Sequence, residues 1–487
     1  MRVLEKLNHH AQTRPDTPAY SLVDRLGSPV QTLMYRAFAQ AVAVAADAIS
    51  EATPDNAVVI IQMPNSLTYP VAYLGVLAAG RTVFPLHPAL TTHEVAQAAA
   101  KADAQWIISA GETPDGMTRI APGVVASWLS ASDSASPLSS NAAGSMLLQS
   151  SGTTGLPKIV ERSAESIDAV AENVAESVRY LPGDRVIAAI PLCHSYGIEN
   201  AVVGPIWSGA TVNVCDGFDP DTVATLWADS TRVIFPAVPV MIDLLASRED
   251  LTPPGNELTV YAAGATLPAE VAAAFTSRYG VQVGQLYGAT EIGSVTFGRP
   301  VDQALPEGCV GQPMADVSIR ILDLDNPGEH PPLSPGKEGQ VAVRAPSMLS
   351  RYLGKDTPPM VDGHYLSGDL GQLDEDGALT ITGRVKTLIE VGGMKVNPLE
   401  IETALASHPA VAQCAVVPVR VTQTLSRVTA FYVPQDPQNP PDSAQLRRYL
   451  KDRLAPYKLP RTYKPIDELP RTSLGKVKRA LLAEVAP

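Results

Sequence analysis

The segment Leu147–Val160, LLQSSGTTGLPKIV, holds residues whose types and spacing could do chemistry. Two serines, two threonines, two glycines and a lysine lie within the ten residues Gln149–Lys158. Glycine lets the backbone approach a ligand closely, hydroxyls and amides donate hydrogen bonds, and lysine adds positive charge, so the mixture suits an anion such as phosphate. A plain surface turn is the alternative interpretation of a Ser/Gly/Thr cluster. A Walker A loop is excluded, because Lys158 follows Gly155 by three positions instead of one.

Three further motifs follow in order: YGATEIG (287–293), YLSGDLGQLDEDGALTITGRVK (365–386) and RTSLGKVKR (471–479). Together with the Ser/Thr/Gly loop they resemble the adenylate-forming superfamily of acyl-CoA synthetases, nonribosomal peptide adenylation domains and luciferases. The resemblance runs from about residue 20 to the end of the chain, and LGVLAAGRTVFPLHPAL (74–90) is similar to an early core segment of that family. It implies ATP-dependent activation of a carboxylic acid to an acyl-AMP, with release of pyrophosphate.

The resemblance assigns nucleotide-binding roles to residues of all these motifs. It implies that Tyr287 stacks on adenine beside Gly264, that Thr290 donates to the α-phosphate, and that Glu291 holds Mg²⁺. Asp369 and Arg384 match positions that bind the ribose hydroxyls. The residues expected around the β- and γ-phosphates are Ser150, Ser151, Gly152, Thr153, Thr154, Gly155 and Lys158.

Lys476 matches the catalytic lysine of the family, whose ammonium bridges the reacting carboxylate and the α-phosphate. A carboxylate and a triphosphate repel each other, so the reaction needs converging positive charge. A solvated basic tail remains the alternative for the neighbouring Lys478 and Arg479.

The segment PLCHSYGIENAVVGPIWSGATV (191–212) matches the acyl-pocket segment of the family. Tyr196 stands where members that activate amino acids carry an aspartate, and without that carboxylate an ammonium group would be left unpaired. An aryl or acyl acid is therefore expected. His194 matches a gate near the reacting carboxylate, and Cys193 beside it is not expected to form a dyad with it, because neighbours on a strand point to opposite faces. The expected pocket residues are His194, Tyr196, Gly197, Pro239, Gly264, Gly288 and Gly293.

The family transfers the acyl group to a thiol after the small domain rotates, with the hinge at Lys386–Thr387. Threonine departs from the usual aspartate or lysine there. Gly392 and Gly393 match the segment that lines the tunnel for a pantetheine arm, and they also suit a simple turn. Coenzyme A is the expected acceptor, with a separate carrier protein as the alternative, and a non-catalytic nucleotide-binding protein is a rival from another class.

These residues must be positioned by elements that the sequence also predicts. Strands are expected at 57–64, 185–192, 211–215, 232–239, 258–264 and 281–288, alternating with helices, which is typical of layered α/β folds with mostly parallel sheets. Pro268 and Gly280 bound a predicted helix. A β-rich subdomain with strands such as 339–346 follows, and the chain ends in a small mobile α/β domain whose helix at 442–454 puts Leu446 and Leu450 on one stripe. The expected domains are 1–385, for ATP and acid, and 386–487, a mobile lid.

Composition narrows the possible partners. The net charge of −13 argues against nucleic acid. No apolar run of about 18 residues and no leader pattern is visible, which predicts a cytoplasmic enzyme without membrane insertion. A monomer or a homodimer is expected. The four cysteines lack metal-ligand spacing and indicate reduced structural thiols.

Overall fold

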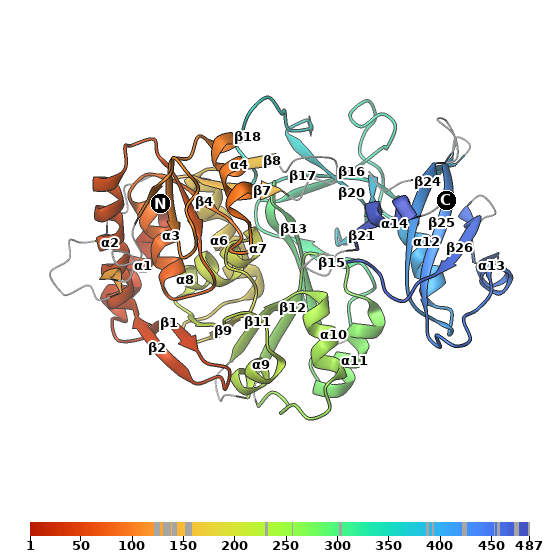
Figure 1. Ribbon diagram of the computed structural model, residues 1–487, viewed down its shortest axis with the longest axis horizontal. Coiled ribbons are helices and arrows are strands. Elements are labelled where there is room, and N and C mark those ends of the chain that lie inside the picture. Colours follow the sequence, from red (N-terminus) through yellow and green to blue (C-terminus); the bar gives the residue numbers. More distant parts are fainter. Residues whose placement is uncertain are drawn as a thin grey trace. The chain divides into compact units, whose positions relative to one another are not determined.

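The computed structural model describes residues 1–120, 127–129, 138, 144–150, 158–228, 232–255, 257–300, 304–385, 389–391, 394–420, 426–451, 453–454, 458–471 and 477–485. The chain forms two compact units (Figure 1). The first comprises Met1–Ile319, Val343–Tyr365 and Gly377–Leu379, and the second comprises Arg320–Ala342, Leu366–Asp376 and Thr380–Pro487. Lys386–Leu388 lie outside the described residues, so the boundary at 385–386 and the hinge stay predictions.

One sheet of the first unit is mainly parallel. Its order is β18-β8-β7-β4-β3-β5-β6. The parallel strands are β3 (Val58–Gln62), β4 (Thr82–Pro85), β5 (Trp106–Ser109), β6 (Thr118–Arg119) and β7 (Met146–Ser150). β8 (Lys158–Arg162) pairs antiparallel with β7 and places Lys158 opposite Ser150, and β18 (Arg351–Tyr352) pairs antiparallel with β8. The two ends of the Ser/Thr/Gly loop are thereby held side by side.

A second run of strands in the first unit has the order β15-β14-β13-β12-β11-β9-β10-β1-β2. Parallel pairing extends from β13 to β1, through β13 (Val283–Ala289), β12 (Leu258–Ala262), β11 (Val233–Ala237), β9 (Arg185–Ala188), β10 (Thr211–Val214) and β1 (Pro18–Val23). The outer members β2 (Pro29–Met34), β14 (Gly293–Gly298) and β15 (Cys309–Pro313) pair antiparallel. The predicted layered α/β class with mostly parallel sheets is confirmed.

Two strands end earlier than the sequence predicts. β9 stops at Ala188, although the apolar run continues to Leu192. Most of the residues that follow Ala188 in this run are also buried, so the apolar run is longer than the strand. β11 stops at Ala237, and Pro239 begins helix α10 (Pro239–Ser247), where a missing N–H costs nothing.

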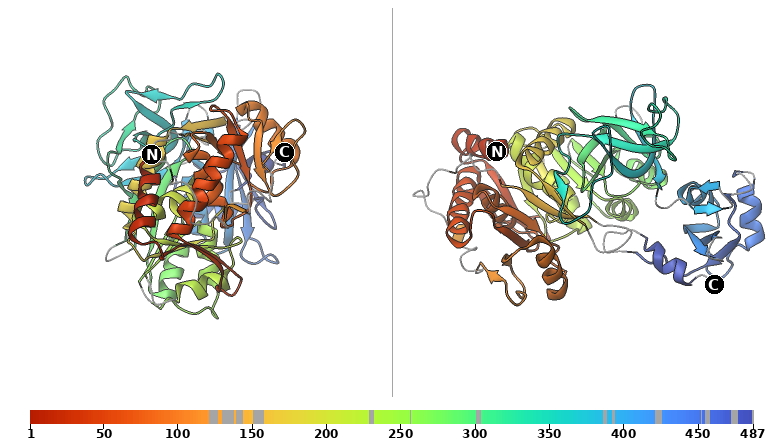
Figure 2. Two further views of the ribbon diagram at one scale, coloured as in Figure 1. Left: turned by 90° about the vertical axis from the view of Figure 1, so that its left-hand side faces the viewer. Right: turned by 90° about the horizontal axis from the view of Figure 1, so that it is seen from above.

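Helices cover these sheets. They are α1 (Arg2–Thr13), α2 (Tyr35–Ala52), α3 (Thr68–Ala78), α4 (Thr92–Ala102), α6 (Ala164–Val178), α7 (Ser195–Ile198), the π-helix η1 (Glu199–Val203), α8 (Gly204–Ser208), α9 (Pro220–Trp227) and α11 (Ala269–Tyr279). α2 packs against both α1 and α3, and these N-terminal helices lie together in the red and orange part of the ribbon (Figure 2). α3 is buried over nearly its whole length, consistent with its lack of charged residues. The predicted helix between Pro268 and Gly280 is confirmed, and Gly280 supplies the left-handed stop at φ 68°.

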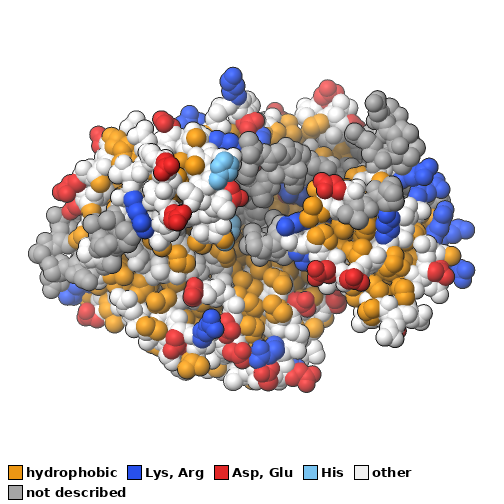
Figure 3. All heavy atoms as spheres, in the orientation of Figure 1, with side chains coloured by type: hydrophobic (Ala, Val, Ile, Leu, Met, Phe, Trp, Pro, Cys, Tyr) orange, Lys and Arg blue, Asp and Glu red, His pale blue; other side chains and the backbone are white. Residues whose placement is uncertain are grey.

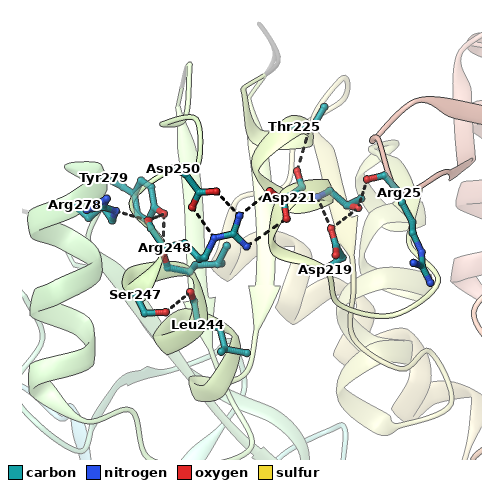
Figure 4. Close-up of polar contacts among 12 residues, drawn as sticks. Arg25, Asp219, Asp221, Thr225, Leu244, Ser247, Arg248, Asp250, Arg278 and Tyr279 are labelled. Carbon is teal, nitrogen blue, oxygen red and sulfur yellow. Dashed lines mark hydrogen bonds and ion pairs between the residues drawn. The ribbon is translucent and has the colours of Figure 1, made fainter.

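An ionic cluster ties α9, α10 and α11 together at the surface (Figure 4). Arg248, which follows α10, contacts Asp221 of α9 at 2.9 Å and Asp250 at 2.7 Å. Arg278 of α11 donates from Nε to the Arg248 carbonyl oxygen at 2.6 Å. The Arg248 guanidinium lowers the pKa of Asp250 to about 2, so this carboxylate stays ionised over the physiological range.

The second unit contains most of the strands β16 (Ser318–Leu322), β17 (Gly339–Arg344), β20 (His364–Leu373) and β21 (Leu379–Arg384), which are consecutive neighbours and each have one or two residues in the first unit. β19 (Met360–Val361) lies in the first unit and pairs with β20. Hairpin β22 (Ile389–Val391) and β23 (Met394–Val396) follows, and then a three-stranded sheet of β24 (Val411–Arg420), β25 (Ser426–Pro434) and β26 (Thr462–Pro465). Helices α12 (Pro398–Ala406), α13 (Ser443–Lys451) and α14 (Arg479–Val485) complete it. Leu446 and Leu450 are fully buried, which confirms the predicted stripe of α13.

Acidic and basic side chains are interspersed on the face in Figure 3. Among the described residues, no helix is both long and apolar enough to cross a membrane.

Candidate active site

Four of the predicted acid-binding and nucleotide-binding residues lie at or beyond the ends of four neighbouring parallel strands. His194 follows β9, Pro239 follows β11, Gly264 follows β12, and Tyr287 lies near the end of β13. Carboxyl ends of parallel strands meet at one edge of a sheet, and open α/β sheets bind ligands there. The topology therefore brings four separate sequence segments to one edge.

Three segments of the expected acyl pocket meet at one carbonyl group. The Tyr196 hydroxyl donates to the Ala237 oxygen at 3.1 Å, and the Ala263 amide donates to the same oxygen at 3.1 Å. Ala237 lies two residues before Pro239, and Ala263 directly precedes Gly264. A Cβ on Gly264 would meet no protein atom within 4 Å, but its φ of 85° favours glycine.

Three other predicted pocket glycines are needed for close backbone packing. A Cβ on Gly197 would lie 2.1 Å from the Pro191 oxygen, and a Cβ on Gly288 would lie 2.3 Å from the Gly293 oxygen. Gly293 has φ 71° and packs against the Arg162 guanidinium. These glycines shape the turns that hold the site, and their contact with an acid stays a prediction.

The YGATEIG motif forms a hairpin. Tyr287 lies in β13, Thr290 and Glu291 lie in the turn, and Gly293 begins β14. All three polar side chains are half-buried. The Leu349 amide donates to the Glu291 carbonyl oxygen at 2.8 Å, which fixes the turn.

Lys158 and Glu291 converge on Tyr352 of β18. The Lys158 ammonium lies 4.7 Å from the centre of the Tyr352 ring and 3.4 Å from the Asp356 carboxylate. The Tyr352 hydroxyl donates to Glu291 Oε1 at 3.1 Å. One phenol therefore joins the predicted phosphate lysine and the predicted metal carboxylate, which are separated by more than a hundred residues.

The sequence prediction missed Tyr352, which stands in an ordinary turn-flanked segment, MLSRYLGK. Its hydroxyl also lies 2.8 Å from the Tyr365 hydroxyl. Burial raises the pKa of Tyr352 far above its usual range, with further contributions from Tyr365 and Glu291. The group therefore stays protonated and keeps donating to Glu291.

A buried ion pair behind the site was also missed. Arg162 Nη1 lies 2.6 Å from Glu199 Oε1, and the two side chains are 0% and 2% exposed. The Ser195 hydroxyl donates to Glu199 Oε1 at 2.6 Å, and the Ser294 amide and hydroxyl donate to Oε2 at 2.9 and 2.6 Å. Nearly every bonding position of the carboxylate is filled, which is the condition for burying a charge.

This ion pair connects three parts of the site. Arg162 ends the strand that Lys158 begins, Ser195 follows His194, and Ser294 follows the YGATEIG motif. The network continues from Arg162 Nε to Ser166 at 3.0 Å. No local pattern in the sequence marks this set, because its members are brought together only by the tertiary fold.

In the second unit, Arg384 Nε lies 2.7 Å from Asp369 Oδ1. Asp369 is nearly buried and Arg384 is half-exposed, so the ion pair holds the carboxylate in place while the guanidinium reaches solvent. The Asp369 amide donates to the Ser367 hydroxyl at 3.0 Å. The two residues with a predicted ribose role are thus neighbours in space, and their contact with ribose stays a prediction.

Several predicted site residues lie outside the described residues. They are Ser151, Gly152, Thr153, Thr154, Gly155, Gly392, Gly393 and Lys476. Ser150, at the end of β7, is buried.

The expectation that Cys193 and His194 point to opposite faces is wrong. β9 has ended at Ala188, and the two residues lie in a turn, where side chains do not alternate. One ligand atom from each, and one from His87, all lie within 4.8 Å of one another.

The residues present fit a magnesium ion and a nucleotide. Glu291 is half-buried, and in the described part of the chain only Oε1 of its carboxylate has a hydrogen-bond partner, which leaves Oε2 for a cation. Mg²⁺ binds to proteins through one or two carboxylates together with substrate phosphates. Lys158 begins a strand directly after a loop suited to phosphate.

The family model of AMP-binding enzymes matches residues 7–353, and that of the AMP-binding enzyme C-terminal domain matches residues 400–476. The chain belongs to the AMP-binding enzyme family. It is an α/β protein of the adenylate-forming superfamily, acyl- or aryl-CoA ligase type.

Two curated relatives carry the names of acid–CoA ligases. Sulfoacetate–CoA ligase of Cupriavidus necator is 32% identical over 362 residues, which are 72% of this chain and 69% of the relative. Indoleacetate–CoA ligase of Aromatoleum aromaticum is 30% identical over 343 residues, 69% of this chain and 66% of the relative. The chain thus spans about two thirds of these relatives.

A solved structure matches the chain almost completely. It is the ATP-bound MatB of Rhodopseudomonas palustris, with a TM-score of 0.87, 26% identity and 98% of both chains covered.

Proposed function

We propose that this protein activates a carboxylic acid with ATP, releases pyrophosphate and transfers the acyl group from acyl-AMP to the thiol of coenzyme A. The observation that carries the proposal is the convergence of Lys158 and Glu291 on Tyr352. A lysine ammonium and a glutamate carboxylate that contact the same tyrosine side chain suit a triphosphate with its Mg²⁺. The AMP-binding family and the named acid–CoA ligases among its relatives support the same reaction.

In this reaction the chain's residues position and neutralise charge. Lys158, with the donors of the Ser150–Gly155 loop, would hold the β- and γ-phosphates, and Glu291 would hold Mg²⁺. Magnesium, when bound, would neutralise charge on the phosphates. Thr290 would donate to the α-phosphate, and Lys476 would approach it together with the substrate carboxylate. Tyr287 and Gly264 would bind adenine, and Asp369 and Arg384 the ribose.

Coenzyme A is the proposed acceptor, supported by the coenzyme A ligases among the relatives. A separate carrier protein is the alternative acceptor. Thioester formation with free coenzyme A at micromolar concentration separates the two, because a carrier-dependent enzyme would stop at acyl-AMP.

The proposed acid is an aryl or acyl acid without an ammonium group beside its carboxylate. Tyr196 spends its hydroxyl on the Ala237 oxygen, so it offers an aromatic ring and no negative charge. Sulfoacetate and indoleacetate, the acids in the two relatives' names, differ greatly in size and charge. A pyrophosphate-release screen over benzoates, other aryl acids, short acids with a second anionic group and graded fatty acids is the experiment that identifies the acid.

The proposed function is tested by comparing Glu291→Gln with Glu270→Gln, a change at an exposed acid of α11. We expect Glu291→Gln to lower acid-dependent pyrophosphate release by about 10²-fold or more, and Glu270→Gln to leave it unchanged. A chain that binds ATP and releases no pyrophosphate with any acid of the screen would be a non-catalytic nucleotide-binding protein, and the proposal would be wrong.

A further inference from the structure

Three potential metal ligands meet where turns of two sheets come together. His87 follows β4 of one sheet, and Cys193 and His194 follow β9 of the other. One ligand atom of each residue lies within 4.8 Å of the others. The rings of His87 and His194 are tilted by 33°, with their centres 5.6 Å apart.

We propose that His87, Cys193 and His194 form a binding site for a divalent transition-metal ion of the zinc class. Two imidazoles and a thiolate are borderline-soft ligands that select zinc-class ions over the magnesium that the nucleotide requires. A tetrahedral zinc centre separates its donor atoms by roughly 3.3–3.6 Å. Side-chain movements of about 1 Å would therefore close the site, and three protein ligands leave a fourth position open.

The turn that carries Cys193 is fixed in place. Asn65, which lies beyond the end of β3, accepts a hydrogen bond from the Leu192 amide at 2.9 Å and donates to the Ile190 oxygen at 3.0 Å. The His194 amide donates to the Pro191 oxygen at 3.3 Å. Asn65 follows β3 and His87 follows β4, two neighbouring strands of one sheet, so Asn65 ties the turn of Cys193 to the sheet that carries His87.

Metal coordination would change the bonding of His87 and of Cys193 in defined ways. His87 Nδ1 accepts a hydrogen bond from the Ala89 amide at 3.2 Å, and this long bond would be lost if the metal binds Nδ1 or shifts the ring proton to it. At Cys193 the S–H bond breaks, a sulfur–metal bond forms, and the proton leaves to solvent. Burial raises the pKa of Cys193 to about 12, so the thiol keeps its proton until a metal ion displaces it.

The site does not depend on the proposed ligase activity, and its test reads the metal directly. We would add one equivalent of Co²⁺, as a coloured substitute for Zn²⁺, to the full chain freed of metals. We expect visible bands of four-coordinate cobalt and a near-ultraviolet band from thiolate-to-cobalt charge transfer, both removed by added Zn²⁺.

Cys193→Ser should remove the charge-transfer band, and His87→Asn should weaken cobalt binding by about tenfold or more while keeping that band at high cobalt concentration. Cys215→Ser is the matched control, because Cys215 is equally buried, has a pKa likewise raised to about 12, and is not part of the cluster. His87 is half-buried in a turn, so its variant keeps the test valid even if Cys193→Ser fails to fold.

Absence of the charge-transfer band in the folded wild-type protein would overturn the proposal. Its survival in Cys193→Ser, or its loss in Cys215→Ser, would place the metal elsewhere and overturn it as well. If the proposed function also holds, Zn²⁺ should inhibit acid activation in the wild-type protein and in Cys215→Ser more strongly than in His87→Asn. An inactive protein that still shows the cobalt bands would refute the ligase proposal and leave the metal site standing.

Discussion

Tyr352 joins two residues that belong to different motifs, so its hydroxyl should influence magnesium more than the acid. Hydrogen bonds to charged groups contribute about 1.5–3 kcal/mol. We expect Tyr352→Phe to raise the Mg²⁺ concentration for half-maximal pyrophosphate release by about tenfold or more, with the KM for the acid nearly unchanged. Tyr365→Phe is the comparison variant, since it removes the hydroxyl that lies 2.8 Å from the Tyr352 hydroxyl and leaves the donor to Glu291 in place. Equal effects of both variants on magnesium and acid would contradict this positioning role.

Lys476 is predicted from the sequence alone to act in the first half-reaction. A unit charge at about 4 Å, at an effective dielectric of about 20, contributes roughly 4 kcal/mol. Lys476→Ala should therefore lower acyl-AMP formation by about 10²-fold or more, while thioester formation from supplied acyl-AMP survives better. Equal losses in the two half-reactions would refute the assignment.

His10, on the buried face of α1, should make the first unit sensitive to acid. Burial lowers its pKa to about 4 from an ordinary value of 6.5, and Arg14 contributes further. The folded state prefers the neutral ring, so the full contribution to stability is present above pH 6.5 and is lost as the pH falls toward 4. At pH 5 the loss is about 2 kcal/mol.

This acid sensitivity is measured by urea unfolding of the full chain at pH 7 and pH 5. His10→Gln should lower stability at pH 7 but reduce the difference between the two pH values. His93→Gln, at an exposed histidine of α4, should keep the wild-type difference. If His10→Gln also keeps the wild-type difference between pH 7 and pH 5, another group causes the acid sensitivity.

At the scale of elements, the Arg162–Glu199 pair holds together β8, η1 and β14. Glu199→Gln leaves a buried guanidinium without its counter-charge, which should destabilise the first unit by about 3–5 kcal/mol. Glu172→Gln breaks a partly exposed pair with Arg2 and should cost less than about 1 kcal/mol. Thermal and urea unfolding check both, and a loss of less than about 1 kcal/mol in Glu199→Gln would mean that the pair is not essential to packing.

Element-level patterns explain which parts of the fold were predictable. The helix between Pro268 and Gly280 has local signals at both ends, and the short β-branched run at 211–215 predicts β10 to within one residue. The apolar run at 185–192 predicts too long a β9, since Ile190 and Leu192 are buried beyond the end of the strand and burial alone does not define a strand. That error led to the wrong expectation about Cys193 and His194.

The candidate site was predictable where motifs are local. The motifs predict that Lys158 and Glu291 share a site, and both residues contact Tyr352, while their roles toward phosphate and metal stay predictions. Tyr352 and Glu199 were missed because their partners lie far away in the chain. Such contacts follow from the order of strands in the sheets, which no single segment of the sequence specifies.

At the scale of the whole molecule, the reaction is proposed to need a rotation about Lys386–Thr387. Proline at Thr387 would restrict the backbone there. We expect Thr387→Pro to reduce thioester formation by about tenfold or more relative to pyrophosphate release, measured in parallel on the same preparation. Equal reduction of both activities, with unchanged melting temperature, would place the hinge elsewhere.

The shared phenol of Tyr352 has a consequence for how the nucleotide and its metal bind. Coupling between a triphosphate at Lys158 and magnesium at Glu291 must be reciprocal, because the free energies of binding the two ligands form a closed cycle. If magnesium tightens the hold on a triphosphate by some factor, the triphosphate tightens the hold on magnesium by the same factor. The Tyr352→Phe chain should therefore lose the two enhancements together, and dissociation constants measured for each ligand in the presence and absence of the other would display that symmetry.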